Sequence, residues 1–257
     1  MKPAALVALG LLVIATNTPL AQTLAPAARI ERAVPFRVGE TLTYDVSWSS
    51  FLVAGTVVTT VKEKKPSFDS TAYYVVAEAR PTPLLSSLYA LYYKLDTLLD
   101  ASTLLSQRGS VYTEEGTRHY LRTTRFDRSV RRAFFEYQST TTVKTEFPIA
   151  ASTQDALSAV YVLRTVPLVA GARTMMPVTD DGVKYTMTIS VAGNERVTTP
   201  IGELEAWKVT PVITDEQGQT VGRNLAVWIS GDARRYPLKI QAELPVGAFV
   251  LVLRDAR

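Results

Sequence analysis

Apolar and polar residues alternate along much of the chain, which is the pattern of β-strands that bury one face. In the segment 41–48 every second residue is apolar, and segments 185–191 and 238–244 repeat this period of two. Successive side chains of a strand point to opposite faces, so the period predicts half-buried strands. Further strands are expected at 54–63, 72–79, 93–99, 109–113, 118–126, 130–138, 142–146, 204–213, 222–230 and 247–254.

Short turn sequences separate these segments. Asp181-Gly182 suits a two-residue hairpin turn, because both central residues of such a turn need positive φ. Gln217-Gly218-Gln219 and Asp127-Arg128-Ser129 divide other pairs of strands. Strands at short spacing with hairpin turns predict a mainly β fold: an antiparallel sandwich, barrel or half-barrel of roughly ten to twelve strands.

Two segments break the β pattern. Residues 153–164 place their apolar side chains at helical spacing, with Thr153 as the expected N-cap, Asp155 in the first turn and Pro167 beyond the end. We therefore expect one short helix there. The Leu- and Tyr-rich segment 82–92 fits either a short helix or an irregular apolar loop.

The N-terminus has the layout of a secretory signal peptide. A basic start is followed by an uncharged apolar run, which is shorter than the about 20 residues that a membrane-spanning helix needs. Residues 1–21 are the predicted signal peptide, with cleavage near Ala21, and 22–34 are a flexible lead-in rich in Ala and Pro. Residues 35–257 are expected to form a single β-rich domain, with an internal seam near 148–153. The predicted location is periplasmic or secreted.

Composition excludes several kinds of chemistry. The formal net charge of +4 over 257 residues is a weak field, which argues against nucleic acid as a partner. The chain has no cysteine and one histidine, His119, so disulfides and a zinc site are not expected. No G-x-S-x-G, Walker or Rossmann pattern occurs. Asp180-Asp181 offers carboxylates to a hard cation, but a turn explains the pair without one. We predict no catalytic residue, no metal and no cofactor.

The leading hypothesis is a soluble, exported, non-enzymatic binding protein for an apolar or amphipathic envelope ligand such as a lipid. Curved antiparallel sheets form grooves with apolar walls and few polar anchors. No span across a membrane is expected in the mature chain, although an outer-membrane barrel also fits the alternation. The candidate ligand-binding residues are Leu84, Leu85, Leu88, Tyr89, Tyr92 and Trp228.

The main alternative is an envelope assembly module that binds a protein or an anionic polymer. Arginine binds phosphate and carboxylate groups in bidentate fashion, and interleaved aromatic residues add stacking faces. Pairing with Asp127 and Glu136 on an exposed strand face would account for the same residues without a partner. A glycan-acting hydrolase is a further alternative, since paired carboxylates have no fixed sequence spacing. The candidate anion-binding residues of one hairpin are Arg118, Arg122, Arg125, Arg128, Arg131 and Arg132.

Several motifs resemble one bacterial exported family, which is known as domain of unknown function 3108. They are the segments 36–44, 154–164, 199–202, 207–209 and 227–237. The resemblance covers about residues 35–254. It implies a location in the cell envelope and a β-rich fold, and it implies no chemistry.

Overall fold

The computed structural model describes residues 29–49, 52–88, 90–244 and 247–257. The predicted signal peptide lies outside these residues, as does most of the predicted lead-in. The strands are β1 (Thr41–Trp48), β2 (Leu52–Ser67), β3 (Ser70–Pro81), β4 (Leu91–Asp100), β5 (Ser106–Glu115), β6 (Arg118–Asp127), β7 (Arg132–Gln138), β8 (Thr142–Pro148), β9 (Gln154–Asp155), β10 (Arg173–Asp180), β11 (Val183–Thr199), β12 (Gly202–Asp215), β13 (Arg223–Ser230), β14 (Pro237–Leu244) and β15 (Gly247–Ala256). The helices are α1 (Pro83–Leu88) and α2 (Ala156–Leu163).

All fifteen strands belong to one sheet, in the order β8-β7-β6-β5-β4-β3-β2-β1-β15-β14-β13-β12-β11-β10-β9. Neighbours in this order are antiparallel, except that β9 pairs with β10 in parallel. The predicted mainly β class is confirmed, and the strand count is higher than predicted. The pattern did not indicate β10, because Met175, Met176 and Pro177 interrupt its alternation, and β9 is too short to show a period.

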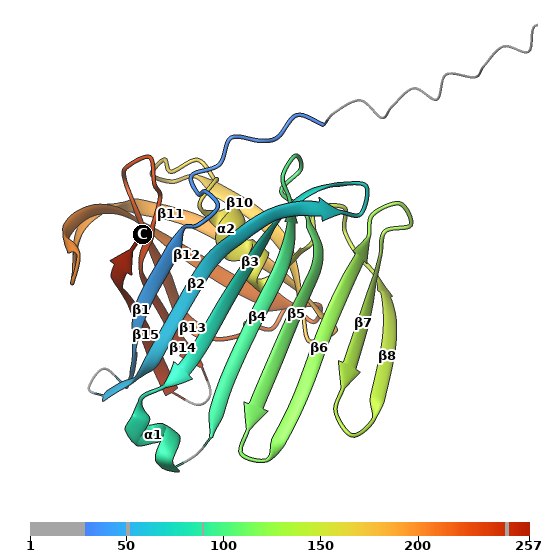
Figure 1. Ribbon diagram of the computed structural model, residues 1–257. Helices are drawn as coiled ribbons and strands as arrows, with labels where there is room; N and C mark the ends of the chain where they lie inside the picture. The colour runs from blue at the N-terminus through green and yellow to red at the C-terminus, as the bar shows by residue number, and fades with distance from the viewer. Residues whose placement is uncertain (1–28, 50–51, 89, 245–246) are drawn as a thin grey trace, which may run out of the picture.

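The sheet is strongly curled, as its connectivity requires. Its two edge strands, β8 and β9, are joined by only residues 149–153. Fifteen strands spaced by about 4.8 Å would spread over about 65 Å if they lay flat, whereas such a link spans about 20 Å. The edges must therefore approach each other, which curls the open sheet into a barrel-like shape with β1–β8 in front and β10–β15 behind (Figure 1). The guanidinium of Arg128, in the β6–β7 turn, joins this link to β5 by donating to the carbonyls of Thr153 and Ser106, each at 2.7 Å.

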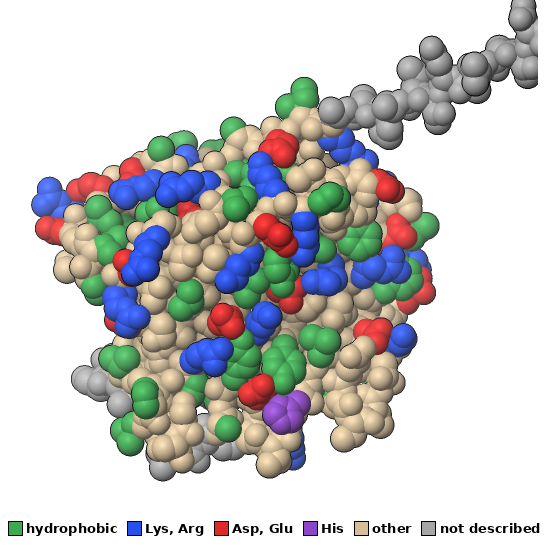
Figure 2. Space-filling model, in the orientation of Figure 1, with side chains coloured by type: hydrophobic (Ala, Val, Ile, Leu, Met, Phe, Trp, Pro, Cys, Tyr) green, Lys and Arg blue, Asp and Glu red, His purple; other side chains and the backbone are tan. Residues whose placement is uncertain are grey.

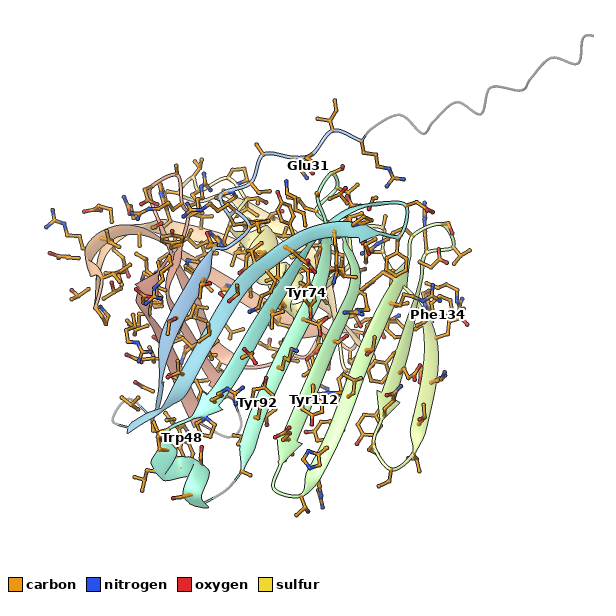
Figure 3. All side chains as sticks on the ribbon, viewed as in Figure 1. Glu31, Trp48, Tyr74, Tyr92, Tyr112 and Phe134 are labelled. Carbon is orange, nitrogen blue, oxygen red and sulfur yellow. The ribbon has the colours of Figure 1, made fainter. Side chains whose placement is uncertain are left out.

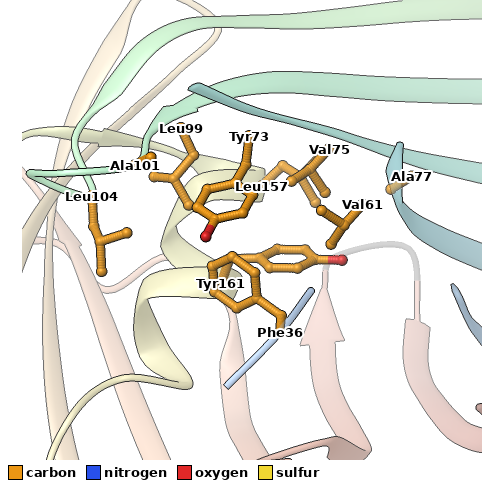
Figure 4. Packing of buried hydrophobic residues seen from close by; sticks show 10 residues of the cluster. All are labelled: Phe36, Val61, Tyr73, Val75, Ala77, Leu99, Ala101, Leu104, Leu157 and Tyr161. Atoms are coloured by element: carbon orange, nitrogen blue, oxygen red, sulfur yellow. The ribbon is translucent and has the colours of Figure 1, made fainter. Parts of the chain in front are cut away.

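The helix α2 lies inside the curl and fills one end of it (Figure 1). Its Leu157 and Tyr161 pack against Phe36 and against the inner faces of β2–β4, where Val61, Val75 and Leu99 are fully buried (Figure 4). The face of the sheet that meets α2 is called the concave face below, and the opposite one the convex face.

The start of α2 corrects the sequence expectation. Asp155, not Thr153, is the N-cap, and its carboxylate accepts from the backbone N–H of Ser158 at 2.9 Å. The helix begins later because Gln154 and Asp155 first pair with β10. Asp155 also accepts from the hydroxyl of Thr97 on β4 at 2.6 Å. Gly109 permits this approach, since a Cβ there would lie 2.7 Å from that of Asp155.

A buried ion pair closes the α2 end. Arg164, at the C-cap of α2, binds both carboxylate oxygens of Glu40 at 2.6 and 3.0 Å. The same guanidinium donates to the carbonyls of Pro35, Arg234 and Arg235. Burying an ion pair is favourable only when the remaining donors are also satisfied, and here two chain segments, at Pro35 and at Arg234-Arg235, supply the three carbonyl acceptors.

Two local predictions can be compared with the structure directly. Asp181 and Gly182 both have positive φ and connect β10 to β11, so the predicted hairpin turn is confirmed. Segment 82–92 divides into α1 and the first residues of β4. Residues 29–34 of the predicted lead-in include Arg32, whose N–H donates to the carbonyl of Ala101 at 2.9 Å.

Candidate functional site

The concave face carries a groove at its α1 end, which is the end opposite to the one that α2 fills. Antiparallel register places side chains in rows that cross the strands, and all members of a row share a face. One row runs from Tyr44 through Val57, Ala79 and Tyr93. The next row towards α1 contains Val46, Gly55 and Pro81. The floor of the groove is therefore built from β1–β4.

This groove has a volume of about 450 Å³ and an almost wholly apolar lining. Besides the floor, its walls are Leu85 of α1, Leu91 of β4 and Phe249 of β15. The Trp48 and Phe249 rings stack at 6.5 Å between centroids at the mouth. Ligand pockets have about 300–1,000 Å³ and mainly hydrophobic walls, so the groove has the size and chemistry of a binding site for an apolar molecule.

The groove continues inward to α2. A second cavity of about 200 Å³ shares Val57 and Ala79 with the groove, and its far wall is Val160 and Tyr161. Leu157 closes the same end. The two cavities adjoin at these shared residues, and together they are called the apolar channel below. The Asp155 cap and the Arg164–Glu40 pair hold α2 at its inner end.

The predicted ligand residues are divided between several places. Leu85 lines the groove, whereas Leu84, with 68% of its surface exposed, does not. Leu88 is the last residue of α1, and Tyr89 lies outside the described residues. Among the lining residues, Trp48, Leu91 and Tyr93 were missed by the sequence prediction.

Tyr92 lies on the convex face, opposite to its neighbour Tyr93 (Figure 3). Its hydroxyl donates to Glu78 and its ring meets that of Tyr112. Burial and then this hydrogen bond raise the pKa of Tyr92 to about 12, and the bond lowers the pKa of Glu78. The prediction had placed Tyr92 in a short helix or an irregular loop that precedes the strand. Because Tyr92 is already in β4, the period of two turns it away from the groove.

Trp228 belongs to a different part of the molecule. It is buried in a cluster with Tyr236 and Leu238. The ammonium groups of Lys208 and Lys239 lie 5.2 and 4.7 Å from the centroid of its ring, and its indole N–H donates to Glu195. This residue therefore stabilises β12–β14 and does not line the apolar channel.

The six predicted arginines do share the β6–β7 hairpin, but they face in different directions. Arg118 and Arg122 line a polar basin on the concave face, whereas Arg125 is exposed and lies 4.6 Å from the centroid of the Phe134 ring. Arg131, with a φ of 53°, is exposed in the turn.

The other two arginines have structural partners. Arg128 joins β5 to the link between β8 and β9, and burial lowers its pKa to about 10. Arg132 pairs with Glu146. The expected partners also differ: Asp127 accepts from Ser129, and Glu136 pairs with Lys144. The hairpin therefore presents no continuous arginine surface.

The convex face of the front strands carries both signs of charge. Figure 2 shows Lys and Arg side chains interspersed with Asp and Glu across this face. Examples are the pairs Arg80–Glu78 and Arg108–Asp96. Over the described part of the chain, no three His, Asp or Glu side chains gather as metal ligands, and no described helix has the length and apolar character to cross a membrane.

Comparison with protein families decides the membership of the chain. The family model described as a protein of unknown function, DUF3108, matches residues 43–254. The chain belongs to this family. A search of curated proteins finds no match. The resemblance inferred from the motifs of DUF3108 is thus confirmed, and family membership by itself assigns no ligand or reaction.

One solved structure shares the fold of this DUF3108 protein, and two others align less well. A β-barrel-like protein of the domain of unknown function 1849 from Brucella abortus aligns with a TM-score of 0.54 at 11% identity, over 85% of this chain and 97% of that chain. A candidate exported protein with a YmcC-like fold from Bacteroides fragilis gives 0.35 at 12%, over 89% and 100%. A candidate lipoprotein from Parabacteroides distasonis gives 0.36 at 11%, over 87% and 98%.

Proposed function

We propose that this DUF3108 protein is an exported, non-enzymatic binding protein that holds the hydrocarbon chain of an amphipathic molecule in the channel between α1 and α2. The observation that carries the proposal is the channel itself: about 450 Å³ of apolar groove that continues into a further 200 Å³. Each buried CH₂ group of a ligand contributes about 0.8 kcal/mol, so a chain that fills the groove gains enough to bind without many polar contacts.

Export is part of this proposal, and it rests on the signal-peptide layout of residues 1–21. The alternative of an assembly module that uses the arginine hairpin has less support, because its six arginines are spread over two faces and the turn.

The test compares two neighbouring valines on opposite faces. Val57 lines both the groove and the inner cavity, while Val58 is opposite Glu78 on the convex face. Both are partly buried. Val57→Phe fills the channel at its junction, whereas Val58→Phe adds the same bulk outside it.

The ligand is the neutral fluorescent dye Nile red, titrated into protein purified without detergent. We expect saturable binding that Val57→Phe weakens by about tenfold, which corresponds to about 1.4 kcal/mol, and that Val58→Phe leaves within a factor of two (~0.4 kcal/mol). Circular dichroism checks that both variants fold. The proposal is wrong if the wild-type protein does not bind the dye, or if the two variants weaken binding equally.

A further inference from the structure

A polar basin adjoins the apolar groove on the same concave face. It has a volume of about 820 Å³, and its lining includes Arg118, Arg122, Glu115, Tyr120 and Asp181. A small cavity between the basin and α2 shares Arg122 and Asp181 with the basin. That small cavity also shares Leu95 and Leu157 with the inner end of the apolar channel. Basin and channel are therefore adjacent parts of one concave surface.

The register shows how abruptly the chemistry changes. Leu91 of β4, a groove residue, lies opposite Glu115 of β5, which lies opposite Arg118 of β6. Strands are spaced by about 4.8 Å, so the backbone of Arg118 is about 10 Å from that of Leu91. The row that begins with Tyr93 reaches Thr113 and then Tyr120 over the same span. The apolar groove and the polar basin are thus separated by a distance similar to the size of a lipid head group, so one molecule can reach both.

Hydrogen bonding organises the boundary. The hydroxyl of Tyr93 donates to the carboxylate of Glu115 at 2.6 Å. Burial and then this bond raise the pKa of Tyr93, which keeps the hydroxyl protonated as a donor. Tyr93 therefore presents its ring to the groove and its hydroxyl to the basin. One oxygen of the Glu115 carboxylate already accepts this hydrogen bond.

The arginines of the basin differ in their partners. Arg122 pairs with Asp181 at 3.2 Å, and 52% of the Asp181 side chain is exposed. Arg118 is exposed, and among the residues that the structure describes no carboxylate lies within ion-pairing distance of it. One guanidinium is thus open to a ligand, and a second is held only by a half-exposed acid that an incoming anion can replace.

From this arrangement, and on the basis of the function proposed above, we infer that the ligand is an anionic amphiphile. Its hydrocarbon chain lies in the groove, and its carboxylate or phosphate head binds Arg118, with Arg122 beside it. The guanidinium fork fits both kinds of anion. Screening by water is reduced in a concave basin, so the charge contact favours an anionic head group over a neutral one of the same size.

The experiment uses cis-parinaric acid, a fluorescent fatty acid, and its methyl ester, which has the same chain without the charge. We expect the acid to bind about tenfold more tightly than the ester, the effect of one charge-assisted hydrogen bond. Arg118→Gln should remove this preference while the affinity for the ester stays unchanged. The matched control is Arg125→Gln, since Arg125 is an exposed arginine of the same strand on the convex face, and it should keep the preference.

The outcomes separate the two proposals. If neither probe binds, the proposed function fails. If acid and ester bind equally, the proposed binding in the channel is supported and the inference of an anionic head group is wrong. Equal losses in Arg118→Gln and Arg125→Gln indicate an unspecific charge effect and overturn the inference. Displacement of the acid by lysophosphatidylcholine more strongly than by lysophosphatidylglycerol would also overturn it, because Glu115 and Asp181 would then bind the cation of a zwitterionic head.

Discussion

The two ends of the concave face are made by the same strands, but one end is buried and the other is partly exposed. At the α2 end, Val61, Val75 and Leu99 are fully buried under the helix and Phe36. At the α1 end, Leu91 and Tyr93 remain partly exposed and line the apolar groove. Alternation of apolar residues is equally regular at both ends. Whether an apolar face becomes core or remains an open groove is therefore decided by what packs on it.

The largest expected effect concerns the ion pair that closes the α2 end. Arg164→Met leaves Glu40 as an uncompensated buried charge and frees three carbonyls, so it should cost about 3–5 kcal/mol of unfolding free energy. Urea unfolding measures the loss. The double variant with Glu40→Leu should recover part of it, and a cost below about 1 kcal/mol for the single variant would show that the pair does not hold this end together.

A matched pair of leucines on β4 tests the contrast itself. Leu99→Ala should cost about 2–5 kcal/mol, because Leu99 is fully buried and its removal leaves a cavity in the core. Leu91→Ala should cost less than about 1 kcal/mol, since Leu91 is partly exposed, yet it should weaken the binding of Nile red. If both variants lose the same stability, the α1 end is core like the α2 end, and the contrast is wrong.

The smallest expected effect sharpens the distinction between the two faces of β4. Tyr92→Phe removes the hydrogen bond that lowers the pKa of Glu78. A carboxylate with a lowered pKa in the folded state stabilises the protein above its unfolded pKa, and this contribution is lost as the pH falls through the folded value. Tyr92→Phe should therefore lower the Tm slightly at pH 7, by less than about 2 °C because the pair is half exposed.

This difference from the wild type should vanish as the pH falls through the lowered folded-state pKa of Glu78, which thermal unfolding at several pH values measures. The affinity for Nile red should not change. Weaker binding by Tyr92→Phe would place Tyr92 in the ligand site after all.

Most of the fold could be predicted from local patterns, because strand alternation and hairpin turns are encoded by residues close together in the sequence. The period of two located most strands, and Asp181-Gly182 located a hairpin. Gln154 and Asp155 were misassigned to the helix, because their strand exists only through pairing with Val178 and Thr179. A contact with residues more than twenty positions away leaves no trace in a short sequence window.

The site was less predictable than the fold, for a related reason. The apolar segment 82–92 does contribute Leu85 and Leu91 to the groove, but a shift in where β4 begins reverses which side chains face inward. Tyr92 was thus predicted to line the groove, whereas Tyr93 lines it in the structure. The separation of Arg118 from Arg125 follows from the same period, and it could have been inferred once the bounds of β6 were known.

The pairing of β1 with β15 has a consequence for how the protein folds. Nearly all other ladders join strands that follow one another along the chain, so β1–β8 and β10–β15 can each grow by successive hairpins. The β1–β15 ladder joins Leu42 to Ala256 and has to close almost the whole chain. Folding rates fall as contacts become more distant in sequence, so we expect this ladder to form late, when the two meanders meet.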